Sequence, residues 1–269
     1  MRALTGVLAV LFVAGFAWSQ DEKADKQAEK EAEAKAKERV KAVQEKMRKA
    51  RTLEDRINAI DGLGDEPHAV VLTELRKYLG SPEPDLRKEA AGEIGKFKKD
   101  EKASQTLLGA AKGDRVVDVQ VVCLKEIGDV GCKKTAKDLV WFFGHKELDI
   151  AKEAVDSSGS IKAKDSIDPL ITLAEQLELD KERSQQNQQG GTQSGGQMPG
   201  PQVPGGSGTQ QNQDEEKKKR AEELLPRAIQ ALKDITGEKL NTTKEWKKWW
   251  AKNRSFFKDE EDPKKEEKK

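Results

Sequence analysis

The sequence is poor in the residues that build most catalytic and metal sites. Only two histidines and two cysteines occur in 269 residues. The histidines, His68 and His145, lie far apart in the chain, which disfavours a metal site. The common nucleophile, phosphate-binding and zinc motifs are absent, among them G-x-S-x-G, G-x-x-x-x-G-K-[ST] and H-E-x-x-H. We therefore expect a protein that is not an enzyme, with no catalytic residue and no cofactor.

An excess of charge of one sign is lacking too. Fifty basic residues face 49 acidic ones, so the net charge predicts no attraction to nucleic acid, and we expect no nucleic-acid partner. No stretch alternates persistently between apolar and polar residues, so we predict no strands. Charged residues make up 37% of the chain and the mean hydropathy is -0.85. For one compact globule this charged fraction is high and this mean hydropathy is low, which indicates solvated helices or tails.

A single long run without charge lies at the N-terminus, from Ala3 to Trp18. It is too short for a comfortable membrane span, and Ala17-Trp18-Ser19 supplies small residues at the two positions that a signal peptidase reads. We predict that residues 1–19 are a cleaved signal peptide and that the protein is exported to the periplasm or the extracellular space. An uncleaved N-terminal anchor is the alternative.

Four copies of one short phrase, each closed by a glycine, organise residues 53–183. The glycines are spaced 31, 33 and 31 residues apart, a period typical of stacked helical hairpins. Small or apolar residues one, four and five positions before each glycine predict the buried stripe of a first helix. An acid ten positions before it is expected at the helix start, and the glycine is interpreted as the helix stop. The phrases end at Gly64, Gly95, Gly128 and Gly159.

This alternation of a helix carrying D-x-x-x-x-A-x-x-x-[LI]-G with an apolar second helix resembles the HEAT repeat, in its short bacterial, phycobilin-lyase-like form. Residues 85–95 show the pattern in full. The resemblance implies an all-α fold, an α-solenoid of about four hairpins plus a C-terminal capping helix pair. It implies first helices on the convex side and second helices on the concave side, where partners bind. A scaffold for a protein partner is the main hypothesis, and a bilin-lyase-like enzyme or chaperone is the alternative.

The segment before the repeats, residues 20–52, is rich in alanine, lysine and glutamate and is expected to be a charged, partly disordered helix. Only its C-terminal half has an apolar seam, formed by Val40, Val43, Met47 and Ala50. Two interpretations stay open for this seam. It forms a short coiled coil with a partner chain, or it covers the open end of the first repeat.

Residues 184–213 change abruptly to Gln, Gly, Ser and Pro and are predicted to be a disordered linker. C-terminal helices are expected over residues 214–257, and a disordered charged tail over 258–269. Thr242 and Glu245 have the spacing of a capping box, which predicts that the last helix starts at about Thr243.

The last helix carries a cluster of aromatic side chains on one face: Trp246, Trp249, Trp250 and Phe257. The run W-x-x-W-W shortly after I-T-G resembles the terminal signature of exported bacterial HEAT-repeat proteins. One interpretation is that the rings cap the open end of the solenoid. The other is that the rings and nearby lysines make a weak contact with a membrane or glycan surface.

The two cysteines, Cys123 and Cys132, fall on either side of Gly128 in one predicted hairpin. In an exported protein they could form a disulfide across the turn. Alternatively, Cys123 is the small buried residue where the other repeats have alanine, and Cys132 is unrelated to it.

Overall fold

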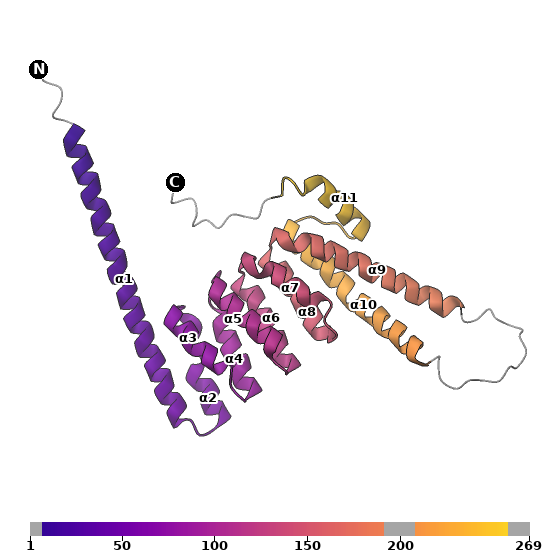
Figure 1. The fold of residues 1–269 in the computed structure, drawn as a ribbon, viewed down its shortest axis with the longest axis horizontal. Helices are drawn as coiled ribbons and strands as arrows, with labels where there is room; N and C mark the ends of the chain where they lie inside the picture. Colours follow the sequence, from indigo (N-terminus) through magenta and orange to yellow (C-terminus); the bar gives the residue numbers. More distant parts are fainter. Residues whose placement is uncertain (1–6, 191–207, 258–269) are drawn as a thin grey trace, which may run out of the picture. The chain divides into compact units, whose positions relative to one another are not determined.

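A computed structural model describes the backbone of residues 7–190 and 208–257 and the side chains of residues 26–186 and 212–257. Every element within these residues is helical (Figure 1), and the helices follow one another in the order of an all-α solenoid of HEAT-like hairpins. The predicted fold class is therefore confirmed. The chain divides into two compact units, Met1–Glu93 and Ile94–Lys269.

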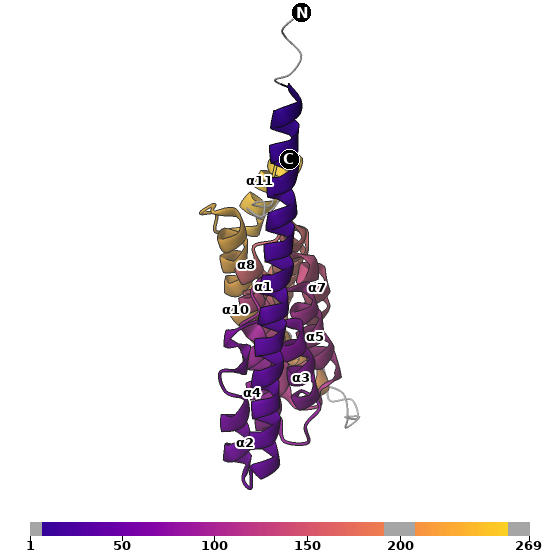
Figure 2. The same ribbon diagram turned by 90° about the vertical axis from the view of Figure 1, so that its left-hand side faces the viewer.

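The first unit contains a long helix followed by the first helical hairpin. Its elements are α1 (Val7–Lys49), α2 (Leu53–Ile60), the 3-10 turn η1 (Leu63–Asp65), α3 (Ala69–Tyr78) and most of α4 (Pro84–Gly95). The unbroken helix α1 (Figure 2) contacts α2 and α3. Arg39 of α1 donates a hydrogen bond to the carbonyl oxygen of Gly62 at 2.6 Å, and Val40 and Val43 are buried. Part of the predicted seam is thus used within the chain, and a coiled coil with another chain stays a prediction.

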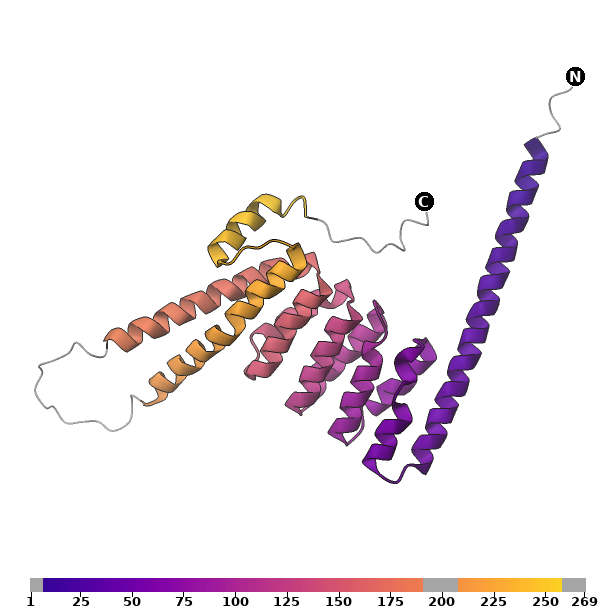
Figure 3. The ribbon, with the colours of Figure 1, turned by 180° about the vertical axis from the view of Figure 1, so that it is seen from behind.

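The second unit contains the remaining helices. In chain order they are α5 (Glu101–Gly113), α6 (Val117–Val130), η2 (Lys133–Thr135), α7 (Ala136–Phe143), α8 (Leu148–Ile161), η3 (Lys164–Ser166), α9 (Ile167–Gly190), α10 (Gly208–Thr236) and α11 (Thr243–Asn253). The first helices α6, α8 and α10 pack side by side, and each is covered by the second helix before it, α5, α7 or α9. Figure 3 shows α9 and α10 as long neighbours with α11 near one end. Apolar residues fill the space between the rows, with Ile127 fully buried.

The predicted helix starts are confirmed. Glu54, Asp85, Asp118 and Asp149 each occupy the second position of a first helix, where the positive end of the helix dipole favours an acid. The last helix begins at Thr243, and Thr242 and Glu245 form the reciprocal hydrogen bonds of a capping box.

The role predicted for the recurring glycines is wrong. The left-handed backbone conformation at helix ends belongs to other residues, among them Gly62, Gly131 and Lys162. Gly128 and Gly159 lie inside α6 and α8, and Gly95 is the last residue of α4. Helix termination therefore does not explain why glycine returns at this spacing.

The recurring glycines instead permit close approach by the next first helix. A β-carbon at Gly128 would lie 3.1 Å from the α-carbon of Ser157, and one at Gly159 would lie 3.0 Å from the α-carbon of Ala231. At Gly95 it would collide with the carboxylate of Glu126. β-carbons rarely sit as close to a neighbour as at Gly128 and Gly159, so a larger residue there would make the adjacent first helix shift by a few tenths of an ångström, whereas at Gly95 the flexible end of the Glu126 side chain would have to move.

The side chains two positions before Gly95 and Gly159 complete the contact with the preceding repeat. The carboxylate of Glu93 accepts hydrogen bonds from the backbone nitrogens of Gly62 at 3.1 Å and Gly64 at 2.5 Å. The hydroxyl of Ser157 donates to the carbonyl oxygen of Leu124 at 2.8 Å. These bonds satisfy buried backbone groups at the point where the glycine leaves room, so each fixes one repeat against the one before it.

The linker is narrower than predicted at both ends. Helix α9 continues to Gly190 and α10 begins at Gly208. Ser184, the expected first linker residue, is buried, and its hydroxyl donates to the carbonyl oxygens of Asp180 at 2.8 Å and Asp214 at 3.2 Å. Packing of α9 on α10 stabilises helix in a polar stretch whose composition alone indicates coil. The centre of the linker, the predicted tail 258–269 and the side chains of the predicted signal peptide lie outside the described residues.

Candidate interaction surfaces

Helix α7, the second helix of its hairpin, carries an exposed tryptophan. The side chain of Trp141 is 61% exposed, whereas its neighbours Leu139, Phe142 and Phe143 are buried. The Trp141 ring contacts the edge of Phe142, with ring centroids 4.7 Å apart, and tilts against His145 at 6.2 Å. It is the one tryptophan among the described residues with so large an exposed fraction. Single exposed apolar residues are common on protein surfaces, but tryptophan is enriched among interface hot spots, which makes Trp141 a candidate contact residue.

The helix that carries Trp141 is held at both ends. The guanidinium of Arg220, on α10, donates to the carbonyl oxygens of Phe143 at 2.6 Å and His145 at 2.7 Å, where α7 ends. Burial lowers the pKa of Arg220 from its usual value, yet the two charge-assisted bonds keep the side chain in place. At the other end, the buried hydroxyls of Ser104 and Thr135 are 2.8 Å apart. Hydrogen bonds at both ends therefore hold α7, the helix that carries Trp141, in place.

Sequence reasoning missed Trp141. The buried stripe of α7 is formed by Ala136, Leu139, Phe142 and Phe143. Trp141 falls off that stripe, on the side where the other second helices carry polar or small residues. A large aromatic on the polar side of an amphipathic helix was the signal that could have found it.

The predicted aromatic face of α11 is mostly turned inward. Trp246 and Trp250 are buried, and Trp249 and Phe257 are partly exposed. The indole nitrogen of Trp250 donates to the carboxylate of Asp168 on α9 at 2.6 Å. The rings of Trp249 and Trp250 lie 6.1 and 5.9 Å from that of Phe257, so the structure brings all four predicted residues together.

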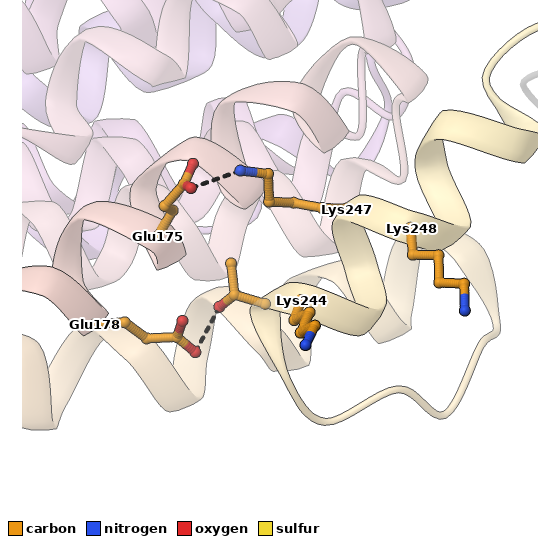
Figure 4. A pocket seen from close by; sticks show the side chains of 6 residues that line it. Glu175, Glu178, Lys244, Lys247 and Lys248 are labelled. Carbon is orange, nitrogen blue, oxygen red and sulfur yellow. Dashed lines mark hydrogen bonds and ion pairs between the residues drawn. The ribbon is translucent and has the colours of Figure 1, made fainter.

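A shallow cavity lies where α11 meets α9. It has a volume of about 500 Å³ and is lined by Thr243, three lysines of α11 and two glutamates of α9. The ammonium of Lys247 pairs with Glu175 at 2.5 Å, and the hydroxyl of Thr243 donates to Glu178 at 2.7 Å (Figure 4). Lys244 and Lys248 point away from the two carboxylates (Figure 4). These bonds attach α11 to α9 and occupy the acids that line the cavity.

Both cysteines are buried. Cys123 lies inside α6, at the position where other repeats have alanine, and Cys132 precedes the turn η2. A disulfide between them stays a prediction.

Three acids of the first unit lie near one another. Oxygen atoms of Asp61, Glu89 and Glu93 are within 4.8 Å. Glu93 already accepts the backbone hydrogen bonds of Gly62 and Gly64 described above, which gives the buried member of the group a structural role.

In the second unit, the carboxylate of Glu126 is buried beside Gly95, and this burial raises the pKa of Glu126 to about 7. The nearby negative charge of Asp129 raises this pKa as well.

The fold and its glycine contacts define a helical-repeat protein of the α-solenoid class. Comparison of the chain with protein families gives a match to the HEAT repeats over residues 40–120, from the second half of α1 into α6. The match supports a HEAT-repeat family and covers α1 residues that the sequence analysis placed before the repeats. No curated protein matches the chain. Among the described residues, no helix is long and apolar enough to cross a membrane.

Proposed function

We propose that this protein is an exported, non-catalytic scaffold that holds a protein partner on its row of second helices. The observation that carries the proposal is the regular stack itself. Close glycine contacts fix the first helices α6, α8 and α10 against one another, and the second helices α5, α7 and α9 cover them as the other row. HEAT repeats commonly mediate protein interactions, and the resemblance puts the second helices on the concave side.

The aromatic cluster of α11 serves as a cap in this proposal. A solenoid must cover the apolar side of its last repeat, and the burial of Trp246 and Trp250 against α9 supports that role. Binding of a membrane or glycan through Trp246 and Trp250 would require these two rings to leave the interior. The other ring groups of the cluster, Trp249 and Phe257, contact the buried pair and complete the cover.

Site-specific photo-crosslinking tests the choice of surface. A photoreactive amino acid is placed at exposed positions of second helices, Gln105 and Thr172, and at exposed positions of first helices, Asp118 and Lys125. The protein is expressed in its own host and irradiated in intact cells. We expect a discrete protein adduct from the second-helix positions alone. Adducts from the first-helix positions alone, or from none of the four, would overturn the proposal.

Cell fractionation tests export. We expect the protein outside the cytoplasm, with a mature N-terminus at Gln20 after removal of residues 1–19. A cytoplasmic chain that retains Met1 would contradict this part of the proposal and leave the scaffold role in place.

A further inference from the structure

Charged residues of the second unit are divided between the two ends of its helical hairpins. One end holds the turns from first to second helices, with the segment of α11 attached: residues 95–102, 129–137, 160–166 and 237–257. These residues include fifteen basic and six acidic side chains, a net charge of +9. The opposite end has two basic and seven acidic side chains, a net charge of -5, in residues 113–118, 143–149, 184–190 and 208–216. Since the whole chain has a net charge of only +1, the fold separates charges of opposite sign.

The four basic segments form one continuous surface, which we name the basic edge. Each segment contacts the next through its side chains. The contacts are Lys98 to the carbonyl oxygen of Asp129 at 2.8 Å, Lys134 to Glu101 at 2.5 Å, Lys137 to Asp165 at 3.4 Å and Lys164 to the carbonyl oxygen of Phe257 at 2.6 Å. Because packed helices lie about 10 Å apart, the basic edge extends over roughly 30 Å.

Much of the positive charge of the basic edge is not neutralised by a neighbouring acid. Six of its lysines are exposed and form no ion pair with any residue whose side chain the structure describes: Lys102, Lys162, Lys239, Lys244, Lys248 and Lys252. Figure 4 shows Lys244 and Lys248 pointing away from the carboxylates of α9. An anionic group that approaches the basic edge therefore meets cations that it does not have to separate from a partner.

The acids beside α11 do not cancel this charge. They are three residues of α9 that already bind side chains of the α11 segment, namely Asp168, Glu175 and Glu178. Counting them with the basic edge still leaves a net charge of +6. The tail that follows, residues 258–269, holds five lysines and six acids and so changes the total little.

The basic edge also carries one large exposed apolar ring. The side chain of Phe256 is 82% exposed, although the turn beneath it is held in place. The backbone nitrogens of Phe256 and Phe257 donate to the carbonyl oxygen of Asn253 at 2.9 and 2.8 Å, and Arg254 lies 3.1 Å from Asp168. An aromatic ring displayed among lysines can enter the acyl region of a bilayer while the lysines stay at the headgroups.

We infer that the basic edge binds the surface of a bilayer that contains anionic phospholipids, with the lysines at the phosphate groups and Phe256 among the acyl chains. An extended row of unpaired lysines fits a flat anionic surface, and each lysine near such a surface adds to the attraction. The contact uses the ends of the hairpins, so the exposed sides of α5 and α7 stay free for the proposed protein partner. The inference rests on the proposed export, which brings the chain to a membrane surface and away from nucleic acid.

Vesicle co-sedimentation is the first test. The protein is purified from its own host, as processed on export, and mixed with vesicles of phosphatidylglycerol, of phosphatidylcholine or of both in equal parts. We expect binding to rise with the phosphatidylglycerol content and to fall as salt is added. Equal binding to the two pure lipids, or no binding to either, overturns the inference.

Lysine variants locate the contact. Lys162→Gln, Lys248→Gln and Lys252→Gln should each weaken binding to phosphatidylglycerol vesicles by about fivefold. Lys146→Gln is the matched control, because Lys146 is an exposed lysine at the opposite end of the hairpins, and it should leave binding unchanged. Unchanged binding in the first three variants, or an equal loss in the control, would mean that the basic edge is not the contact.

Variants of Phe256 separate a bilayer from a soluble polyanion. Phe256→Ser should weaken vesicle binding by about tenfold, and Phe256→Trp should retain it. Neither variant should lower the melting temperature, since the ring is 82% exposed. Heparin and a duplex oligonucleotide are titrated in parallel. Tighter binding of either than of the vesicles, or vesicle binding that ignores Phe256, would overturn the bilayer in favour of a polyanion.

Failure of this inference and failure of the proposed function are distinguishable. Crosslinks from second-helix positions without vesicle binding would leave the scaffold standing and reject the membrane contact. A cytoplasmic location would reject export, whereas the vesicle and variant results would still decide whether the basic edge binds lipid.

Discussion

Substitution of Gly64 by alanine tests whether the recurring glycines are positions of close approach. A β-carbon at Gly64 would collide with the backbone carbonyl oxygen of Glu93 and would lie 2.9 Å from its carbonyl carbon. Both of these atoms belong to the α4 backbone, so no side-chain rotation can relieve the overlap. Helix α4 would have to move away from η1, and the hydrogen bonds from Gly62 and Gly64 to the Glu93 carboxylate would lengthen or break.

The expected cost follows from these two effects. Overpacking of a tight contact costs about 1–3 kcal/mol. Loss of a hydrogen bond to a buried charged group adds about 1–3 kcal/mol, part of which the displaced carboxylate recovers from water. The gain in backbone propensity on replacing glycine by alanine is at most about 1 kcal/mol. We therefore expect Gly64→Ala to lower the free energy of unfolding by about 2–4 kcal/mol, by the balance of these terms.

Gly92→Ala is the matched control. Gly92 lies in α4, and a β-carbon there meets no atom within 4 Å, so alanine should stabilise the helix by about 0.5–1 kcal/mol. Urea unfolding of both variants is followed by circular dichroism and by tryptophan fluorescence. All tryptophans with described side chains lie in the second unit, so the shift should be larger by circular dichroism. A Gly64→Ala variant as stable as Gly92→Ala would refute close approach as the reason for the glycine period.

Three further changes probe the second unit. Ile127→Ala removes a fully buried side chain and should cost about 2–5 kcal/mol in urea unfolding; a neutral result would mean that the first-helix core is misassigned. Glu126→Gln should stabilise the protein by about 1–3 kcal/mol at pH 8 and have little effect at pH 5. The reason is that the pKa of Glu126 is about 7 in the folded state and 4.5 ordinarily, so ionisation of this carboxyl lowers the stability of the wild type as the pH rises from 4.5 to 7. A difference in melting temperature that does not depend on pH would contradict this. Trp250→Phe loses the bond to Asp168 and should cost about 1–2 kcal/mol, and an unchanged melting temperature would argue against the cap.

Local signals in the sequence were sufficient to predict the helices of the repeats and the residues at which they begin. The acids at the second helix position and the Thr242–Glu245 capping box act through atoms within one turn, so they can be read without knowing the tertiary structure. The period of the glycines likewise gave the repeat and the fold class. Their role could not be read in the same way, because a glycine required at a helix end and one required by a neighbouring helix look alike in sequence. The helices that face them in the structure distinguish the two, as with Ser157 beside Gly128 and Ala231 beside Gly159.

The predicted boundaries of the linker were wrong for a related reason. Residues 184–190 are polar and have little tendency to bury apolar surface, so composition assigned them to coil. In the structure they continue α9 alongside α10, and the Ser184 hydroxyl bridges the two helices. Tertiary packing of this kind overrides composition, and it involves a partner thirty positions away in the chain, Asp214.

The tryptophans show that burial, and not residue type alone, decides which rings are available to a ligand. The sequence left two interpretations open for the α11 tryptophans, a cap of the solenoid or a weak contact with a membrane or glycan, and it gave no role to Trp141. The burial of Trp246 and Trp250 favours the cap. Trp246 is fully buried and Trp250 is committed to Asp168, so both gain nothing further from a ligand, whereas Trp141 keeps most of its ring in water. Because the free energy available from aromatic burial is roughly proportional to the area still exposed, Trp141 is the tryptophan with the most to gain from a partner.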